Sequence, residues 1–204
     1  MKASLFVGAH PDDIELGCGG TLSKYKHVPT VALIMTRGKG GCGAGRDRRE
    51  ETAKALDSLY VNVIEQLEFT DKTLFKNIDM LIAEVDRVFE KYSIREVFTH
   101  SKTDFHQDHV TVYRATMAGC RRKGVSIFGY ETVSTPPQFT PDTFIDVSKH
   151  LEDKFKALAY HRSQSGKDYM NTDKLRAKAV FRGDQINVKY AEGFEAYRIV
   201  KNVR

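Results

Sequence analysis

Residues 4–20 read SLFVGAHPDDIELGCGG and place an apolar run, a polar turn and a glycine-rich segment in direct succession. The run at residues 4–9 shows no alternation of apolar and polar side chains, which is typical of a strand buried on both faces. A helix is expected to follow over residues 16–26. A buried strand that leads at once into a helix starts a βαβ unit, so this segment predicts an α/β fold.

The same alternation of strand and helix continues along the chain. We expect further strands at residues 30–36, 63–69, 96–99 and 125–131. The spacing of apolar residues predicts further helices over residues 46–59, 78–89, 108–121 and 148–161. Residues 135–141 hold three prolines and residues 164–172 are mostly polar, so both segments are expected to be loops. These patterns predict one Rossmann-like domain over residues 1–204, with three αβα layers and a mostly parallel central sheet.

Polar side chains follow the ends of several predicted strands. His10 follows the first strand, Arg37 the second and His100 the fourth, while Tyr130 lies at the end of the fifth. Ligands of parallel sheets bind beyond the carboxyl ends of the strands, so these positions should open on one edge. Arg37 and Tyr130 are therefore candidate substrate contacts. His100 itself is interpreted as an ordinary surface or loop histidine.

The composition is that of an ordinary globular protein. Of 204 residues, 41% are hydrophobic and 29% are charged, and the formal net charge is +5. The densest basic group, Arg46, Arg48 and Arg49, runs directly into two glutamates, which argues against a nucleic-acid-binding face. The three cysteines form no CxxC pair, and no apolar run is long enough for a bilayer span or a signal sequence. We therefore expect a soluble cytoplasmic protein with reduced thiols.

Two clusters combine histidine with aspartate. The first is His10-Pro11-Asp12-Asp13, and the second is His106-Gln107-Asp108-His109. Such side chains suit a borderline cation like Zn²⁺, which in catalytic sites commonly keeps three protein ligands and one water. A nearby carboxylate can then accept the proton of that water, and a histidine can protonate a leaving group. Either cluster alone is also compatible with a helix cap or a turn, whereas both at one sheet edge indicate a metal site.

These motifs resemble those of the PIG-L/LmbE-like zinc-dependent N-deacetylases. AHPDDIELGCGGTL at residues 9–22 is similar to the first signature of that family. The second signature, DxHxDH, is matched by Asp104, His106, Asp108 and His109. Weaker similarities occur at Thr36-Arg37-Gly38, at Arg48 and Glu51, at residues 154–164 and at YAEGF of residues 190–194. The resemblance thus spans nearly the whole chain.

The resemblance implies a role for each member of the two clusters. The zinc ligands would be His10, Asp13 and His109. Asp12 would act as general base toward the attacking water, and His106 would protonate the leaving amine or stabilise the oxyanion. Asp108 would orient a histidine. The implied reaction is hydrolysis of an N-acetyl or other N-acyl group on an N-acetylglucosaminyl compound, which releases acetate and a free amine.

The resemblance also bears on the substrate and the cofactor. Arg48 would contact the substrate, and His161 would reach the site. Basic residues near the expected site, among them Lys39 and Arg48, favour an anionic or nucleotide-linked amino sugar. The ligand set accepts Fe²⁺ as well as Zn²⁺. A monomer and a homo-oligomer both remain open.

Two other functions fit parts of the sequence. Residues 38–43, GKGGCG, match the GxGxxG pattern, so a NAD(P)-dependent oxidoreductase is one alternative. That fingerprint normally follows the first strand of a sheet, whereas this segment follows the second predicted strand. The other alternative is a metal-dependent sugar-binding module without catalysis, which would have no use for Asp12 as a base. Titration with NAD tests the first alternative, and an Asp12→Asn variant tests the second.

Overall fold

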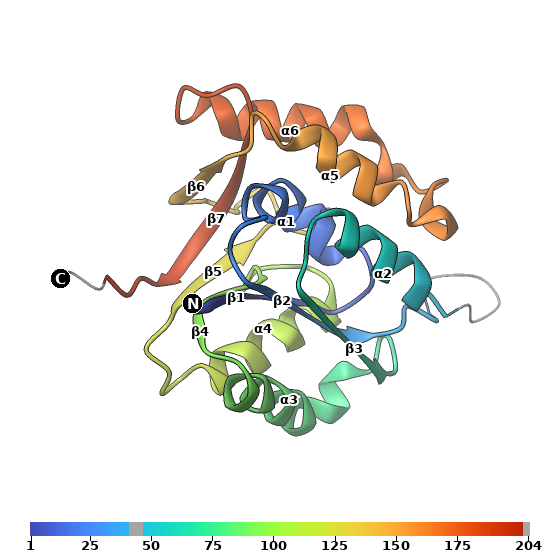
Figure 1. The fold of residues 1–204 in the computed structure, drawn as a ribbon. Coiled ribbons are helices and arrows are strands. Elements are labelled where there is room, and N and C mark those ends of the chain that lie inside the picture. Colours follow the sequence, from blue (N-terminus) through green and yellow to red (C-terminus); the bar gives the residue numbers. More distant parts are fainter. Residues whose placement is uncertain (41–46, 202–204) are drawn as a thin grey trace.

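The computed structural model describes residues 1–40 and 47–201, in which one sheet is flanked by helices on both faces (Figure 1). Its strands are β1 (Ala3–Gly8), β2 (Thr30–Thr36), β3 (Val63–Phe69), β4 (Ile94–His100), β5 (Ser126–Tyr130), β6 (Thr143–Asp146) and β7 (Ala191–Arg198). Their spatial order is β3-β2-β1-β4-β5-β7-β6. Strands β1 to β5 run parallel, and β7 is antiparallel to β5 and β6. The predicted αβα architecture with a mostly parallel sheet is confirmed.

The described helices form the two outer layers. They are α1 (Asp13–Lys24), α2 (Arg49–Ser58), α3 (Ile78–Lys91), α4 (Gln107–Gly119), α5 (Leu151–Leu158) and α6 (Thr172–Asp184), with 3₁₀ helices at Leu74–Asn77, Arg162–Gln164 and Asp168–Met170. Helices α3 and α4 cover one face of the sheet, and α1, α2 and α5 cover the other (Figure 1). Within the described ranges, no helix has the length and apolar character needed to cross a membrane.

Alternate side chains of β1 enter two separate cores. Leu5 and Val7 pack with apolar residues of α3 and α4, whereas Phe6 packs with apolar residues of α1 and α2. All three side chains are completely buried. Burying one such side chain contributes about 1.5–3 kcal/mol, which explains why the strand tolerates no polar alternation.

Most predicted elements are found, with shifted ends. β2 and β3 have the predicted bounds, and β4 extends beyond residues 96–99 at both ends. Helix α1 begins at Asp13, three residues earlier than expected, because Asp13 and Glu15 in its first turn interact favourably with the helix dipole. Helix α5 is shorter than the predicted segment 148–161, and the predicted start of α2 at residue 46 lies outside the described residues.

The C-terminal region contains three elements that the sequence patterns did not predict: β6, β7 and α6. β7 reads AEGFEAYR, so acidic residues interrupt its apolar positions. Glu192 is nevertheless buried, because its carboxylate accepts hydrogen bonds from the backbone of Gly20, from Thr21 and from Lys154. Partners that come from distant parts of the chain, rather than hydrophobic periodicity, allow this strand to enter the sheet.

Helix α1 approaches the sheet closely at Gly17. A Cβ atom at this position would lie 2.3 Å from Cδ2 of Tyr130, so the contact requires glycine. The ring of Tyr130 is consequently sealed under the helix, and its hydroxyl donates a hydrogen bond to the carbonyl of Val7 at 2.8 Å.

The topology creates one crevice at the carboxyl ends of the strands. From β1 the chain builds β2 and β3 on one side, and it then crosses to build β4 and β5 on the other side. Such a reversal between neighbouring strands is where open parallel sheets bind ligands. The segments that leave β1 and β4 carry the two histidine and aspartate clusters, so the fold brings the clusters together there.

Candidate active site

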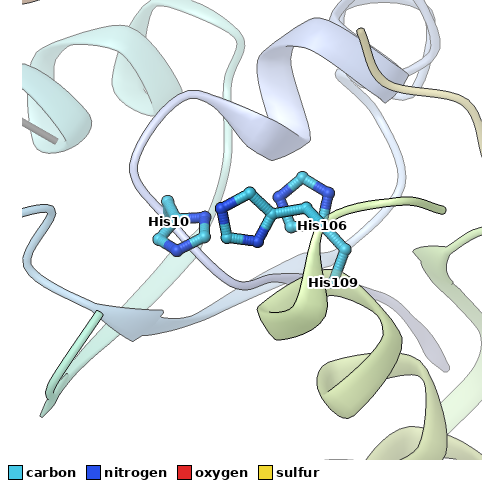
Figure 2. A group of neighbouring side chains, drawn as sticks. All are labelled: His10, His106 and His109. Carbon is cyan, nitrogen blue, oxygen red and sulfur yellow. The ribbon is translucent and has the colours of Figure 1, made fainter. Parts of the chain in front are cut away.

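Three histidine side chains converge at the crevice between β1 and β4 (Figure 2). His10 lies in the loop after β1, His106 caps the N-terminus of α4, and His109 lies in the first turn of that helix. The ring centroids are 4.8 Å apart for His10 and His106, 4.5 Å for His106 and His109, and 5.4 Å for His10 and His109. The two sequence clusters therefore form one site.

The carboxylate of Asp13 lies close to two of these imidazoles. Its Oδ2 atom is 3.4 Å from Nδ1 of His10, and its Oδ1 atom is 3.3 Å from Nε2 of His109. Nitrogen and oxygen donors bound tetrahedrally to Zn²⁺ at about 2.0–2.1 Å lie roughly 3.3 Å from one another. The distances from Asp13 to His10 and to His109 are therefore compatible with donors that share one metal ion.

Other donor sets lie in the same region. Among the residues that the structure describes, two groups of three place their ligand atoms within 4.8 Å of one another: His10, His106 and His109, and Asp13, His100 and His109. Each group contains two of the three predicted ligands. Both groups contain His109, and the predicted set of His10, Asp13 and His109 combines members of the two groups.

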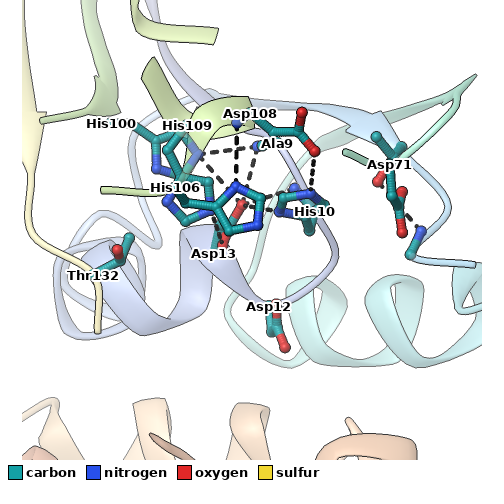
Figure 3. A network of polar contacts seen from close by, with 12 residues as sticks. Ala9, His10, Asp12, Asp13, Asp71, His100, His106, Asp108, His109 and Thr132 are labelled. Atoms are coloured by element: carbon teal, nitrogen blue, oxygen red, sulfur yellow. Dashed lines mark hydrogen bonds and ion pairs between the residues drawn. The ribbon is translucent and has the colours of Figure 1, made fainter. Parts of the chain in front are cut away.

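Each predicted histidine ligand has one ring nitrogen held by a carboxylate. Nε2 of His10 is 3.0 Å from Oδ2 of Asp108 (Figure 3), and Nδ1 of His109 is 3.1 Å from Oδ2 of Asp104. These contacts fix the rings and leave the other nitrogen of each ring toward Asp13. Metal-binding histidines commonly have this arrangement, so the residues present fit a metal ion.

The surrounding carboxylates stabilise positive charge at this point. Burial lowers the pKa of His10, but Asp108 and Asp13 together raise it to about 10. Burial also lowers the pKa of His109, whereas Asp13 and Asp104 raise it to about 9. A metal ion bound in place of these ring protons would be stabilised by the same carboxylates.

Asp12 is directed to partners different from those of Asp13. Its backbone is left-handed, with φ of 94°, and such a strained conformation in a non-glycine residue costs about 1–3 kcal/mol and is typical of functional sites. Oδ2 of Asp12 accepts hydrogen bonds from Nη2 of Arg48 at 2.9 Å and from the hydroxyl of Tyr169 at 3.2 Å. Burial raises the pKa of Asp12, and the charge of Arg48 opposes that rise. The strained turn thus separates the environments of two adjacent carboxylates.

Buried charged groups hold Arg48 in position behind Asp12. Nη2 of Arg48 is 3.3 Å from Nδ1 of His161, and Nε2 of His161 is 2.8 Å from Oε1 of Glu15. Nε of Arg48 is 3.5 Å from a carboxylate oxygen of Glu51. Arg48, His161 and Glu15 are almost completely buried, so these contacts are shielded from water. His161 therefore supports Arg48 from behind.

The hydrogen bonding of His106 determines which ring nitrogen carries its proton. Nδ1 of His106 accepts a hydrogen bond from the backbone N–H of Asp108 at 3.2 Å, so the neutral ring carries its proton on Nε2. Burial lowers the pKa of His106, and the charges of His109 and His10 lower it further. A neutral ring with an Nε2–H donor is the form that this environment favours.

Most of the predicted site residues line one cavity of about 250 Å³. They are His10, Asp12, Asp13, Arg48, His106 and His109. Asp108 is buried behind His10, and Arg37 lines a neighbouring cavity of about 180 Å³. The structure does not bring Tyr130 or His161 to the cavity wall, because Tyr130 is covered by α1 and His161 lies behind Arg48. Both are therefore placed differently from the substrate contacts expected of them.

The structure also brings residues to the site that the sequence patterns did not single out. Tyr169 and Lys167 come from the segment expected as a loop, and Lys72 comes from the turn after β3. No periodicity or motif marks these positions. The interpretation of His100 as a surface or loop histidine is wrong, because His100 is the last residue of β4 and is fully buried. Its position directly after the buried residues Val97, Phe98 and Thr99 is the signal that could have identified it.

The glycine-rich segment after β2 contacts the site through Gly38. Gly38 has φ of 70°, and a Cβ atom there would lie 2.7 Å from Cδ of Arg48 and 3.0 Å from Pro11. The close approach of this backbone to Arg48 therefore explains the first glycine of the GxGxxG match. Residues 41–43 of that match lie outside the described residues.

Comparison with known proteins agrees with this geometry. Residues 5–120 match the family model PIG-L, described as GlcNAc-PI de-N-acetylase. The chain is 36% identical over 170 residues to the uncharacterized deacetylase YaiS of Escherichia coli K12, a match that covers 79% of this chain and 91% of the relative. It is 26% identical to the diacetylchitobiose deacetylase of Thermococcus kodakarensis, with 95% and 82% covered. The solved structure of the conserved protein TT1542 from Thermus thermophilus has a TM-score of 0.85 at 28% identity, and the match covers 100% of this chain and 98% of that one.

Proposed function

Because the chain belongs to the PIG-L family, we propose that it is a metal-dependent N-deacetylase that hydrolyses the N-acetyl group of an N-acetylglucosaminyl compound. One observation carries this proposal: two adjacent carboxylates serve two different environments. Asp13 lies against His10 and His109, whereas Asp12 is held by Arg48 on the cavity wall. A module that only bound a metal and a sugar would need the first arrangement and have no use for the second.

His10, Asp13 and His109 would hold the metal ion. When bound, Zn²⁺ or Fe²⁺ would lower the pKa of a water molecule and polarise a carbonyl group. Two imidazoles and one carboxylate accept either metal, so the metal content of the purified protein decides between them.

Asp12 is placed to carry a proton through the reaction. Its carboxylate accepts a proton from water as the water oxygen attacks the acetyl carbon. Because burial raises its pKa, the carboxyl group can hold this proton until the C–N bond breaks. The proton then passes to the amine nitrogen, and acetate and the free amino sugar leave the site. Arg48 and Tyr169 keep the carboxylate in place through both transfers.

His106 is suited to stabilise the oxyanion. The sequence left two roles open for this residue, namely proton donor to the amine and partner of the oxyanion. Its Nδ1 is occupied by the backbone N–H of Asp108, and its lowered pKa favours a neutral ring. A neutral Nε2–H group donates a hydrogen bond to developing negative charge without giving up its proton, which supports the second role. Asp108 contributes indirectly by holding His10.

The cavity has room for about one sugar ring. Its volume of about 250 Å³ is below the roughly 300–1,000 Å³ of sites for drug-sized ligands. The similarity to a diacetylchitobiose deacetylase supports an N-acetylated amino sugar as substrate. Any second sugar or aglycone would extend over the rim, where the lining residue Val133 is 49% exposed.

Two lysines on the cavity wall favour a substrate with an anionic group. Lys72 and Lys167 both line the cavity. Lys72 has φ of 68°. Its backbone N–H donates a hydrogen bond to the carboxylate of Asp108, and its carbonyl accepts one from the side-chain amide of Gln107. A strained residue fixed by the DxHxDH motif itself is a candidate for a substrate contact. We propose a phosphate or carboxylate near the amino sugar as its partner.

Replacing Lys72 with asparagine is expected to lower kcat/KM for N-acetylglucosamine 1-phosphate about fivefold, as one exposed charge contact of about 1 kcal/mol predicts. The value for neutral N-acetylglucosamine should stay within about twofold of wild type, because the lost contact involves charge alone. Asparagine tolerates the left-handed backbone of this position. Lys76→Asn, at an exposed lysine outside the cavity lining, is the matched control. Equal losses for both substrates would contradict an anion contact.

The decisive experiment is an acetate-release assay with a panel of N-acetylhexosaminyl compounds, including nucleotide sugars. We expect one acetate per free amine formed, loss of activity after treatment with a chelator, and recovery on addition of Zn²⁺ or Fe²⁺. A His109→Ala variant treated in parallel should not recover, because it lacks one donor of the proposed set. If the metal-loaded wild type releases acetate from no compound of the panel, the proposed reaction is wrong.

The state of the cysteines indicates in which cellular compartment the protein works. Cys18 and Cys120 are buried, free thiols in the described part of the chain. Burial raises the pKa of Cys18 far above its usual value and that of Cys120 to about 12, so both are chemically inert. Unpaired thiols are typical of reducing compartments, which supports the cytoplasm as the location.

A further inference from the structure

A fourth imidazole, that of His100, lies beside His109 (Figure 3). His100 ends β4, and its side chain is completely buried. Its ring is nearly parallel to that of His109, with centroids 3.9 Å apart and an angle of 12° between the planes. None of the catalytic steps described above uses this residue.

His109 is the middle ring of a stack of three imidazoles. The ring centroid of His100 lies 3.9 Å from that of His109. The ring centroid of His106 lies 4.5 Å from that of His109, with an angle of 23° between the ring planes. The edge of the His109 ring is held as well, because Nδ1 contacts Asp104 at 3.1 Å and Ser134 at 3.3 Å. Nε2, which faces Asp13, is the ring atom left for a metal.

His100 also contacts the other side of the ligand set. Its Nε2 accepts a hydrogen bond from the backbone N–H of Ala9 at 3.0 Å and lies 3.3 Å from Oδ2 of Asp13. The hydroxyl of Tyr130 is 3.2 Å from the same nitrogen. One imidazole therefore contacts the carboxylate of Asp13 and the ring of His109. It is itself held by Ala9, directly after β1, and by Tyr130 at the end of β5.

These contacts argue that His100 does not itself bind the metal. A ligand role would use Nε2, which is already occupied by the N–H of Ala9. Because Nε2 accepts this hydrogen bond, the ring carries its proton on Nδ1 and is neutral. A neutral, planar and immobile group is suited to hold neighbouring side chains in place.

We propose that His100 is a positioning residue of the metal site: its ring supports His109 by stacking and fills the space behind Asp13, so that both present their donor atoms at the correct spacing. This inference rests on the proposed metal ligands and goes beyond the proposed reaction. It predicts that the shape of the side chain at this position, and not its nitrogen atoms, determines metal affinity.

The test compares zinc affinity among His100→Ala, His100→Phe and His109→Phe, measured by competition with a chromophoric chelator. His100→Ala removes the supporting ring and should weaken zinc binding about 10–100-fold, as the loss of supporting groups around metal ligands commonly does. His100→Phe keeps a planar ring and should stay within about threefold of wild type. Phenylalanine cannot accept the hydrogen bond from the backbone N–H of Ala9. That N–H still has a partner, because it also donates to Oδ2 of Asp13 at 3.1 Å. His109→Phe should abolish stoichiometric binding.

Two further measurements keep the test decisive if the phenylalanine variant does not fold. The absorption bands of the Co²⁺-loaded protein should shift in His100→Ala, because the bands report ligand geometry. X-ray absorption of the zinc-loaded wild type and His100→Ala should give the same number of bound imidazoles. Thermal unfolding of the metal-free variants serves as the folding control.

Several results would overturn the inference. Wild-type zinc affinity in His100→Ala would show that the stack has no positioning role. Loss of one bound imidazole in that variant, or loss of zinc in a folded His100→Phe variant equal to that in His109→Phe, would make His100 a ligand. Failure of the wild-type chain to bind zinc or iron would contradict the metal site itself, and therefore also the proposed function.

Discussion

Asp12→Asn is expected to lower kcat for acetate release about a thousandfold, within the roughly 10²–10⁴-fold contribution of a positioned general base. The substitution removes the proton-accepting oxygen and keeps the size of the side chain. Because Asp12 contacts Arg48 and Tyr169, while Asp13 contacts His10 and His109, the variant should still bind one equivalent of metal. Steady-state kinetics and metal analysis of the same sample measure both effects.

Two variants make this first prediction specific. Asp13→Asn changes the adjacent carboxylate and should lose the metal as well as the activity, because it removes a proposed ligand. Asp79→Asn, at an exposed position in the first turn of α3, should match wild type in both measurements. Retention of more than a tenth of wild-type kcat in Asp12→Asn, or loss of its metal, would show that Asp12 is not the base.

Arg48→Met is expected to lower the free energy of unfolding by about 3–5 kcal/mol, the usual effect of removing one partner of a buried ion pair. Both side chains of the Arg48–Asp12 pair are almost completely buried, at 3% and 6% exposure. Without the guanidinium, the carboxylate of Asp12 remains in the protein interior, where the hydroxyl of Tyr169 still donates a hydrogen bond but brings no positive charge. Methionine keeps the length of the apolar stem, so the effect reports the lost charge.

A double-mutant cycle separates this charge effect from a packing effect. Asp12→Asn/Arg48→Met removes both charges and should be more stable than Arg48→Met by about 1–3 kcal/mol, because no unpaired buried charge remains. Urea unfolding of the metal-free proteins gives the four free energies. If the two single effects simply add, Asp12 and Arg48 are not coupled, and Arg48 is held instead by its contacts with His161 and Glu51.

The N-terminal part of the fold was predictable because local pattern and burial coincide there. β2 and β3 are completely or largely apolar at the positions that pack on helices, and their predicted bounds are correct. The pattern is lost in β7, where the buried Glu192 depends on Gly20, Thr21 and Lys154 for hydrogen bonds. A sequence shows a carboxylate in such a strand, but it does not show partners that lie far away along the chain.

The candidate site divides in the same way. The residue types of the two clusters and their positions after strands were sufficient to predict that His10, Asp13, His106 and His109 come together. The environment of each side chain was not predictable, since it depends on segments such as that of Tyr169, which has no motif. Arg37 was expected at the cavity because it follows a strand, and Tyr130 because it lies at the end of one. The structure instead places Arg37 in a neighbouring cavity and Tyr130 under α1.

The sequence by itself therefore determined the α/β fold and the presence of histidines and aspartates at the ends of β1 and β4, because both depend on local order along the chain. Only the tertiary structure decided what each group does there. The left-handed turn at Asp12 directs two adjacent carboxylates to different partners. The pairing of β4 with β1 and β5 brings the ring of His100 into stacking contact with that of His109. The physical reason is that protonation and orientation depend on burial and on charged partners, and these are supplied by residues that are neighbours in space and distant in sequence.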